Sequence, residues 1–214
     1  LLLYWAFVLH AVTILFVAHT APFSPWSFGD YLSRMMPLLW LGMLFFLTFY
    51  TSPQARRAAI LMDATPMPPK LYALARCAAA LTGGALLTLL CMVEAAVFYG
   101  RMFHWYSWGS LLLPALVTLL PALVFALGSG WLAGQIRPWL VYVWMAVPFL
   151  LAALPLPEAL GLWNGSFFTA YPLTLGTLDP VFVVPVGVTV VQAVLLAAGT
   201  VLLILGSNRR KVMR

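Results

Sequence analysis

The stretch "TSPQARRAAILMDATPMPPKLYALAR", residues 51–76, is the only long polar interruption in the first half of an otherwise apolar chain. One apolar run precedes it at residues 35–50, and a second, at residues 71–98, begins within its last six residues. A helix that crosses a bilayer needs roughly 20 mostly apolar residues, and these runs approach or exceed that length. The stretch therefore divides the chain between two predicted membrane spans, and the remaining spans can be placed by working outward from it.

The composition of the whole chain indicates an integral membrane protein. Of the 214 residues, 64% are hydrophobic and 7% are charged, whereas soluble domains carry about 25% charged residues. Only helices and closed barrels satisfy their backbone in lipid, and the apolar runs here are continuous rather than alternating. The sequence thus predicts an all-α integral membrane protein.

Six apolar runs are expected to form the transmembrane helices of a single domain that covers residues 1–214. They are residues 1–17, 35–50, 71–98, 108–133, 139–154 and 181–205. The first run starts at the first residue with no charged flank, so we expect a cytoplasmic segment to precede it. Prolines inside or beside several runs predict kinks, which neighbouring helices can accommodate.

Basic residues in the connections predict the orientation, because cytoplasmic loops carry an excess of Lys and Arg. One set of connections and the tail hold nine of them: Arg56, Arg57, Lys70, Arg76, Arg137, Arg209, Arg210, Lys211 and Arg214. The opposite set holds only Arg34 and Arg101. The first set is therefore predicted to be cytoplasmic, together with both termini.

The connection between the fifth and sixth runs, residues 155–180, reads "PLPEALGLWNGSFFTAYPLTLGTLDP". It is too apolar for a solvated loop and too interrupted by Pro and Gly for a span. Irregular backbone survives at membrane depth only where protein or water covers it. We therefore predict a re-entrant or interfacial segment on the outer side.

The opening stretch is predicted to contain a short cytoplasmic helix at residues 53–64. Thr51 or Ser52 can cap its start, and Pro53 suits the first helical position. The sequence "TPMPP" ends it, because proline removes a donor and disfavours helical geometry in the residue before it. An alternative reading is a basic loop on anionic lipid, worth about 1 kcal/mol per basic residue.

The pattern "ARRAAILMDATPMPPKLYALAR" resembles the cytoplasmic connection of type-2 ATP-binding-cassette exporter permeases. In that family a charged helix after the second span leads to a turn often close to "DATP", followed by a Lys and the third span. Asp63, Ala64, Thr65, Pro66 and Met67 carry the resemblance here, with Lys70 in the expected place. The expected six spans, inner termini and long apolar outer connection agree with the same family.

This resemblance implies a membrane-spanning permease subunit, in which residues 53–64 form the coupling helix. Two separate nucleotide-binding subunits would bind and hydrolyse ATP with Mg²⁺. The residues implied in the contact with them are Arg56, Arg57, Ile60, Leu61, Asp63 and Pro66. A second permease copy or a relative would pair through the first and fifth spans, with Tyr4, Trp5, Trp139 and Trp144 as candidates.

The expected setting is the bacterial cytoplasmic membrane, with membrane lipid but no nucleic acid as a further partner. The few charges favour an amphipathic or apolar cargo for export. Two other functions remain open: a non-transporting anchor or sensor subunit of a larger complex, and a substrate-binding or scaffold component of an importer.

The sequence contains no phosphate-binding loop of the G-x-x-x-x-G-K-[ST] kind, so ATP hydrolysis is expected in the partner and no enzyme activity in this chain. Ser129 lies in Gly-Ser-Gly, but a serine nucleophile needs a base, and no histidine is predicted nearby. His10 and His19 are separated by about 13.5 Å of helix and cannot share a metal ion. We expect no catalytic residue, metal or bound cofactor here, although His10 could ligate a haem together with a histidine of another chain.

Glu94 is the one acid well inside an apolar run, and acids in membrane spans are functional candidates. It could belong to a transport pathway, or it could reach the interface or pair with Arg101. Ala126, Gly130 and Gly134 have the spacing of small residues that allows close helix packing.

Overall fold

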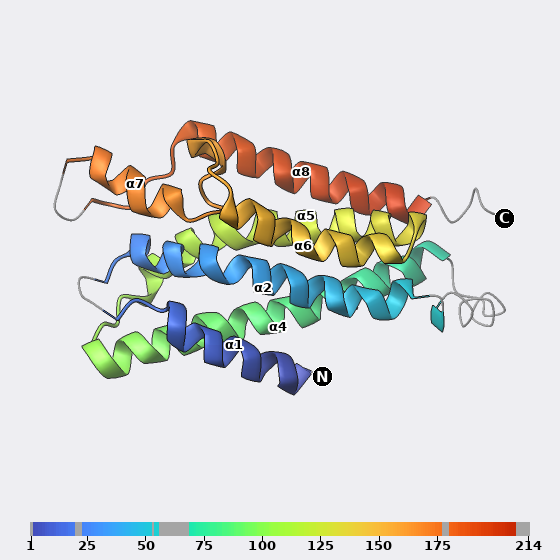
Figure 1. Cartoon of the computed structure of the whole chain (residues 1–214), viewed down its shortest axis with the longest axis horizontal. Helices are drawn as coiled ribbons and strands as arrows, with labels where there is room; N and C mark the ends of the chain where they lie inside the picture. Colours follow the sequence, from blue (N-terminus) through green and yellow to red (C-terminus); the bar gives the residue numbers. More distant parts are fainter. Residues whose placement is uncertain (1, 20–22, 53, 56–68, 177–179, 209–214) are drawn as a thin grey trace.

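The computed structural model describes residues 2–19, 23–52, 54–55, 69–176 and 180–208 (Figure 1). All regular secondary structure in these ranges is helical. The helices are α1 (Leu2–Phe16), α2 (Pro25–Thr51), α4 (Pro69–Phe103), η1 (Trp108–Leu111), α5 (Leu112–Ile136), α6 (Trp139–Ala153), η2 (Glu158–Leu160), α7 (Ser166–Thr174) and α8 (Val186–Asn208). The prediction of an all-helical chain is confirmed.

Six of the described helices have 15 or more residues, namely α1, α2, α4, α5, α6 and α8. They lie along the long axis of the molecule and alternate in direction along the chain (Figure 1). Helices α2, α5 and α8 end, and α4 and α6 begin, at the same end of the bundle. We call this the basic end, because Arg76 and Arg137 lie in the first turns of α4 and directly after α5. Helix α7 lies at the other end, which we call the α7 end.

Among the described residues, four helices are long and apolar enough to cross a membrane: Pro25–Thr51, Leu71–Phe103, Trp108–Ile136 and Val186–Gly206. Helices α1 and α6 are apolar but shorter. Fifteen residues of helix span about 22 Å, less than the roughly 30 Å of a bilayer core. The structure therefore contains four helices of membrane-spanning length, and the count of six spans stays a prediction.

The second predicted span, residues 35–50, is too short, because α2 starts ten residues earlier, at Pro25. Ser24 caps the helix: the Ser27 amide donates to Ser24 Oγ, and the Ser24 amide donates to Ser27 Oγ. Pro25 occupies the first position, where its missing amide costs nothing. The sequence predicts a loop for the polar residues that follow, but they lie within the helix, so Arg34 is a helical residue.

Other boundaries also differ from the predicted spans. Helix α4 runs on to Phe103 rather than to residue 98. Helix α8 starts at Val186 rather than at residue 181, because Pro185 disfavours helical geometry before it while its carbonyl accepts the Thr189 amide. The first and fifth predicted spans agree with α1 and α6 within one residue.

Helix α2 lies at the centre of the core and contacts α1, α4, α5, α6 and α7. Trp40, at its middle, is fully buried, and its indole nitrogen donates to the Trp144 carbonyl of α6 at 3.2 Å. The small residues of α5 meet α2 as well: a Cβ at Gly130 would lie 2.2 Å from Leu44 Cδ2, and one at Gly134 would lie 2.5 Å from Thr51 Cγ2. The predicted close packing at these two glycines is confirmed.

The contact between α5 and α8 depends on a residue to which the sequence assigned no role. A Cβ at Gly128 would lie 2.0 Å from the Gly199 carbonyl oxygen, and one at Gly199 would lie 2.7 Å from the Phe125 amide nitrogen. The backbones of α5 and α8 are in direct contact here, so a side chain at either glycine would collide with backbone atoms. Backbone atoms, unlike a flexible side chain, cannot move aside. Such small-residue crossings hold helices together in membranes, where apolar burial gives little drive for association.

Candidate functional site

The predicted coupling residues Arg56, Arg57, Ile60, Leu61, Asp63 and Pro66 lie outside the described residues. The structure does describe where this connection starts and ends. It leaves α2 at Thr51 and enters α4 at Pro69, and these two helix ends lie at the basic end of the bundle (Figure 1). The connection thus joins two antiparallel helices that contact each other.

Arg76 links the two helices at the base of this connection. Its Nη1 donates to the Tyr50 carbonyl at 3.4 Å, which is one of the last carbonyls of α2 and has no partner within the helix. Its Nη2 donates to the Tyr72 hydroxyl, and its guanidinium carbon lies 4.0 Å from the centroid of the Tyr72 ring. The sequence predicts that Arg76 belongs to a cytoplasmic connection, yet it lies within α4 and is buried.

We expect replacement of Arg76 to loosen α2 from α4. Each hydrogen bond from a charged group contributes about 1.5–3 kcal/mol to the free energy of unfolding. Arg76→Met should therefore lower the thermal unfolding midpoint clearly. Arg76→Lys should lower it less, since it keeps the charge but not the planar, stacking group. The matched control is Arg137→Met, at an exposed position of the same end, and equal midpoints for Arg76→Met and this control would contradict the link.

The segment of residues 155–180, for which an outer position is predicted, is folded in its described part. Asn164 fixes the turn before α7: its Nδ2 donates to the Leu154 carbonyl, and its Oδ1 accepts from the amide and hydroxyl of Ser166. The Trp26 indole of α2 donates to the Pro180 carbonyl at 2.9 Å. The segment also forms a separate apolar cluster with α2 and α8, made of Trp26, Leu162, Phe167, Phe168 and Val188.

This cluster sharpens the prediction that the segment is membrane-associated. Single cysteines at residues 162, 167 and 168 should react slowly with a membrane-impermeant thiol reagent because the protein buries them. Leu173 is 81% exposed, so a cysteine there reports on the membrane itself. Slow labelling of Leu173→Cys in vesicles, with rapid labelling after detergent extraction, is the expected result. Rapid labelling in both settings would show a water-exposed segment.

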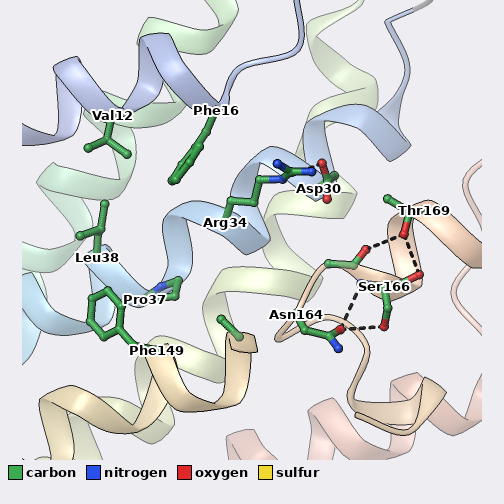
Figure 2. A pocket seen from close by; sticks show the side chains of 12 residues that line it. Val12, Phe16, Asp30, Arg34, Pro37, Leu38, Phe149, Asn164, Ser166 and Thr169 are labelled. Carbon is green, nitrogen blue, oxygen red and sulfur yellow. Dashed lines mark hydrogen bonds and ion pairs between the residues drawn. The ribbon is translucent and has the colours of Figure 1, made fainter. Parts of the chain in front are cut away.

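A pocket of about 690 Å³ lies between α1, α2, α6 and the start of α7 (Figure 2). We call it the outer pocket. Its apolar lining consists of Val12, Phe16, Pro37, Leu38, Phe149 and Ala152. Its polar lining consists of Asp30, Arg34, Asn164, Ser166 and Thr169, with Gly165 between them. In Figure 2 the labelled apolar side chains gather on one side and the hydrogen-bonded polar ones on the other.

An ion pair lies within the outer pocket. Arg34 Nε donates to Asp30 Oδ2 at 3.0 Å, one helical turn apart on α2. Gly165 adopts a φ of 78° beside this pair, and a Cβ there would lie 2.8 Å from Asp30 Oδ1. Glycine is needed here for two reasons. Other residues rarely adopt this positive φ, and a side chain at this position would collide with the Asp30 carboxylate.

A second polar contact joins α1 to the core. His10 Nδ1 lies 3.3 Å from Glu94 Oε1, a distance that makes an ion pair when the imidazole is protonated. The Thr13 hydroxyl lies 3.0 Å from the Tyr31 hydroxyl, which donates to the Cys91 carbonyl. Glu94 therefore pairs with His10 rather than with Arg101. Its Oε2 is buried and has no hydrogen-bond partner in the described part of the chain.

Ser129 has a structural role. Its hydroxyl donates to the Phe125 carbonyl one turn earlier and accepts from the Trp144 indole at 2.7 Å. Trp144 therefore faces α5, and Trp5 is only 9% exposed against the core. Of the four residues proposed for a subunit contact, Tyr4 is 66% exposed and Trp139 is 54% exposed.

The outer pocket was not anticipated from the sequence. The signal for its ion pair was present, since an acid and a base four residues apart lie on one helix face. The predicted second span does not include these residues, because it starts only at residue 35. The polar residues of Asn164–Thr169 gave no comparable signal, because only the folded turn brings them to α2.

The fold and these sites define the class of the protein: an all-helical chain with several helices of membrane-spanning length and composition, as in integral membrane proteins. Comparisons with protein-family models, with curated proteins and with solved structures found no significant match.

Proposed function

We propose that this chain is the membrane-spanning permease subunit of an ATP-binding-cassette transporter of the type-2 exporter kind. The observation that carries the proposal is the position of the "DATP" stretch. It lies in the connection between α2 and α4, two antiparallel helices that Arg76 links at their shared end. A force applied to this connection would be passed to both helices together.

The arrangement of the helices supports the same proposal. The six longer helices alternate in direction (Figure 1), as six membrane crossings with both termini on the cytoplasmic side require. In this proposal the two short helices, α1 and α6, also cross the membrane. The bilayer becomes thinner around them, which costs fractions of a kcal/mol per Å of difference between helix length and bilayer thickness. The basic end is then cytoplasmic, and the α7 end faces outward.

Two nucleotide-binding subunits would dock at the basic end, bind ATP with Mg²⁺ and move the coupling helix at residues 53–64. This chain itself would hydrolyse nothing. A second permease copy would complete the pathway, with the exposed Tyr4 and Trp139 in the contact. The proposed setting is the bacterial cytoplasmic membrane, and the proposed cargo is amphipathic or apolar, because few charged side chains are available to bind a polyanion.

Purification of the chain from its native membrane in a mild detergent tests the proposal. We expect a nucleotide-binding subunit to co-purify, with two permease chains and two ATPase chains in each complex. Replacing residues 54–64 by a Gly-Ser linker of the same length should release the ATPase while the membrane domain still folds. Stable association that does not depend on these residues, or an intact complex with no ATPase, would instead favour an anchor or sensor subunit.

A further inference from the structure

We infer that the outer pocket binds the headgroup of a zwitterionic membrane phospholipid, one that carries a phosphate and an ammonium group. The pocket has the size typical of sites for small molecules, which range from about 300 to 1,000 Å³. This inference concerns a resident lipid and is independent of whether the chain transports anything.

The division of the pocket lining matches an amphiphile. Val12 and Phe16 of α1, Leu38 of α2 and Phe149 of α6 form one wall (Figure 2). Phe16 and Phe149 are partly exposed at the surface of the helices, so a hydrocarbon chain can lie against them. The opposite wall carries the ion pair and the hydroxyl and amide groups of Asn164, Ser166 and Thr169. Apolar and polar groups are therefore separated along the pocket, as they are along a lipid.

The charged groups retain unused hydrogen-bonding capacity. A guanidinium has five N–H donors, and within the described residues only Nε of Arg34 is engaged. Its side chain is 54% exposed. Asp30 Oδ1 accepts no hydrogen bond among the described residues, and the Gly165 backbone packs beside it without a side chain to cover it. Arg34 can thus bind a phosphate, for which a guanidinium is well shaped, while Asp30 Oδ1 binds an ammonium.

The depth of the pair agrees with a headgroup. Helix α2 has 27 residues, about 40 Å, close to the 40–45 Å of a bilayer with its interfacial regions. Asp30 and Arg34 lie about 7.5 and 13.5 Å from the first residue of α2 along its axis. Asp30 is therefore placed at the boundary between headgroups and hydrocarbon, and Arg34 lies about 6 Å deeper, from where its long side chain reaches back to Asp30. Charged side chains at this depth need polar partners.

The balance of charge favours a zwitterion over an anion. The pocket contains one acid and one base, 3.0 Å apart, so it presents no net charge. An anionic headgroup would meet Arg34 but would be repelled by the adjacent Asp30. A headgroup with both charges satisfies both side chains.

The test measures lipid binding to the full chain, purified in a mild detergent together with any subunit that co-purifies. A fluorescent phosphatidylethanolamine is displaced by unlabelled phosphatidylethanolamine, by phosphatidylglycerol or by soluble phosphoethanolamine. We expect phosphatidylethanolamine to compete at least about tenfold more strongly than either of the others, because it alone combines the acyl chain with both charges.

Two variants locate the site. Asp30→Asn combined with Arg34→Gln removes both charges but keeps the polar groups, and Ala152→Trp narrows the pocket without a change of charge. Each should weaken phosphatidylethanolamine binding at least about tenfold. The matched controls are Ala153→Trp, on the next residue of α6 and outside the lining, and Arg101→Gln, an exposed base at the end of α4. Both should leave binding within about twofold of the parent.

Three results would overturn the inference. One is unchanged binding of phosphatidylethanolamine in both pocket variants. If the double variant does not fold, unchanged binding in Ala152→Trp alone is sufficient. A second is equal competition by phosphatidylglycerol, which would indicate an anion site at Arg34. A third is equal competition by soluble phosphoethanolamine, which would indicate a free zwitterion instead of a lipid.

Discussion

Gly128→Leu is expected to abolish most of the correctly folded protein. The first atom of any side chain at this position would lie 2.0 Å from the Gly199 carbonyl oxygen. Because the obstacle is backbone, α5 and α8 must move apart along one of the most extensive helix contacts of the fold. Overpacking usually costs about 1–3 kcal/mol and sometimes more. We expect at least the upper value, since lipid offers little hydrophobic drive to hold separated helices together.

The control for this prediction is Gly187→Leu. Gly187 lies in the first turn of α8, and nothing lies within 4 Å of a Cβ built there. Both variants carry the same substitution in the same chain, and only one meets a neighbouring helix. The measurements are the yield of monodisperse protein in detergent and the thermal unfolding midpoint. Equal yield and midpoint for the two variants would show that α5 and α8 do not approach at Gly128.

Arg56→Glu combined with Arg57→Glu is expected to leave the protein inserted but to uncouple it from its ATPase. This prediction rests on the proposed function, in which both side chains meet acids of the nucleotide-binding subunit. Disrupting a buried charge pair at an interface costs about 2–5 kcal/mol, and 1.4 kcal/mol is a factor of ten. We therefore expect the ATPase subunit to bind at least about thirtyfold more weakly, and stimulation of ATP hydrolysis by substrate to be lost.

Arg137→Glu is the matched control for the charge reversal. Arg137 lies at the same end of the bundle and is exposed directly after α5, but it is not part of the connection between α2 and α4. It should change ATPase binding far less. The double variant and the control are compared by co-purification and by ATPase activity in vesicles. Retained coupling in the double variant would rule out these two arginines as the contact.

Much of the helical framework could be predicted because it depends on continuous apolar runs. The ends of α1 and α6 agree with the runs within one residue. The start of α2 was missed because Asp30, Ser33 and Arg34 look like a loop in the sequence. The fold keeps them helical by burying the apolar residues around them, such as Tyr31 and Leu32.

The contacts between helices were harder to predict. Pairing with Arg101 on its own helix was one of the alternatives for Glu94, yet Glu94 meets His10 of α1. Trp5 and Trp144 were proposed for a subunit contact, yet they face the interior. In both cases the residue type was informative, but the direction of the side chain depends on which helix lies beside it.

The sequence by itself determined the class of structure: a chain with this apolar content must satisfy its backbone within helices, and its polar stretches must separate them. Only the tertiary structure decided what the scarce polar groups do. Asp30, Arg34 and Asn164 form the outer pocket because the turn at Gly165 returns to the first turns of α2. The physical reason is that apolar periodicity reports local burial, whereas a pocket depends on how helices distant in the chain approach, and that is set at backbone contacts such as Gly128 against Gly199.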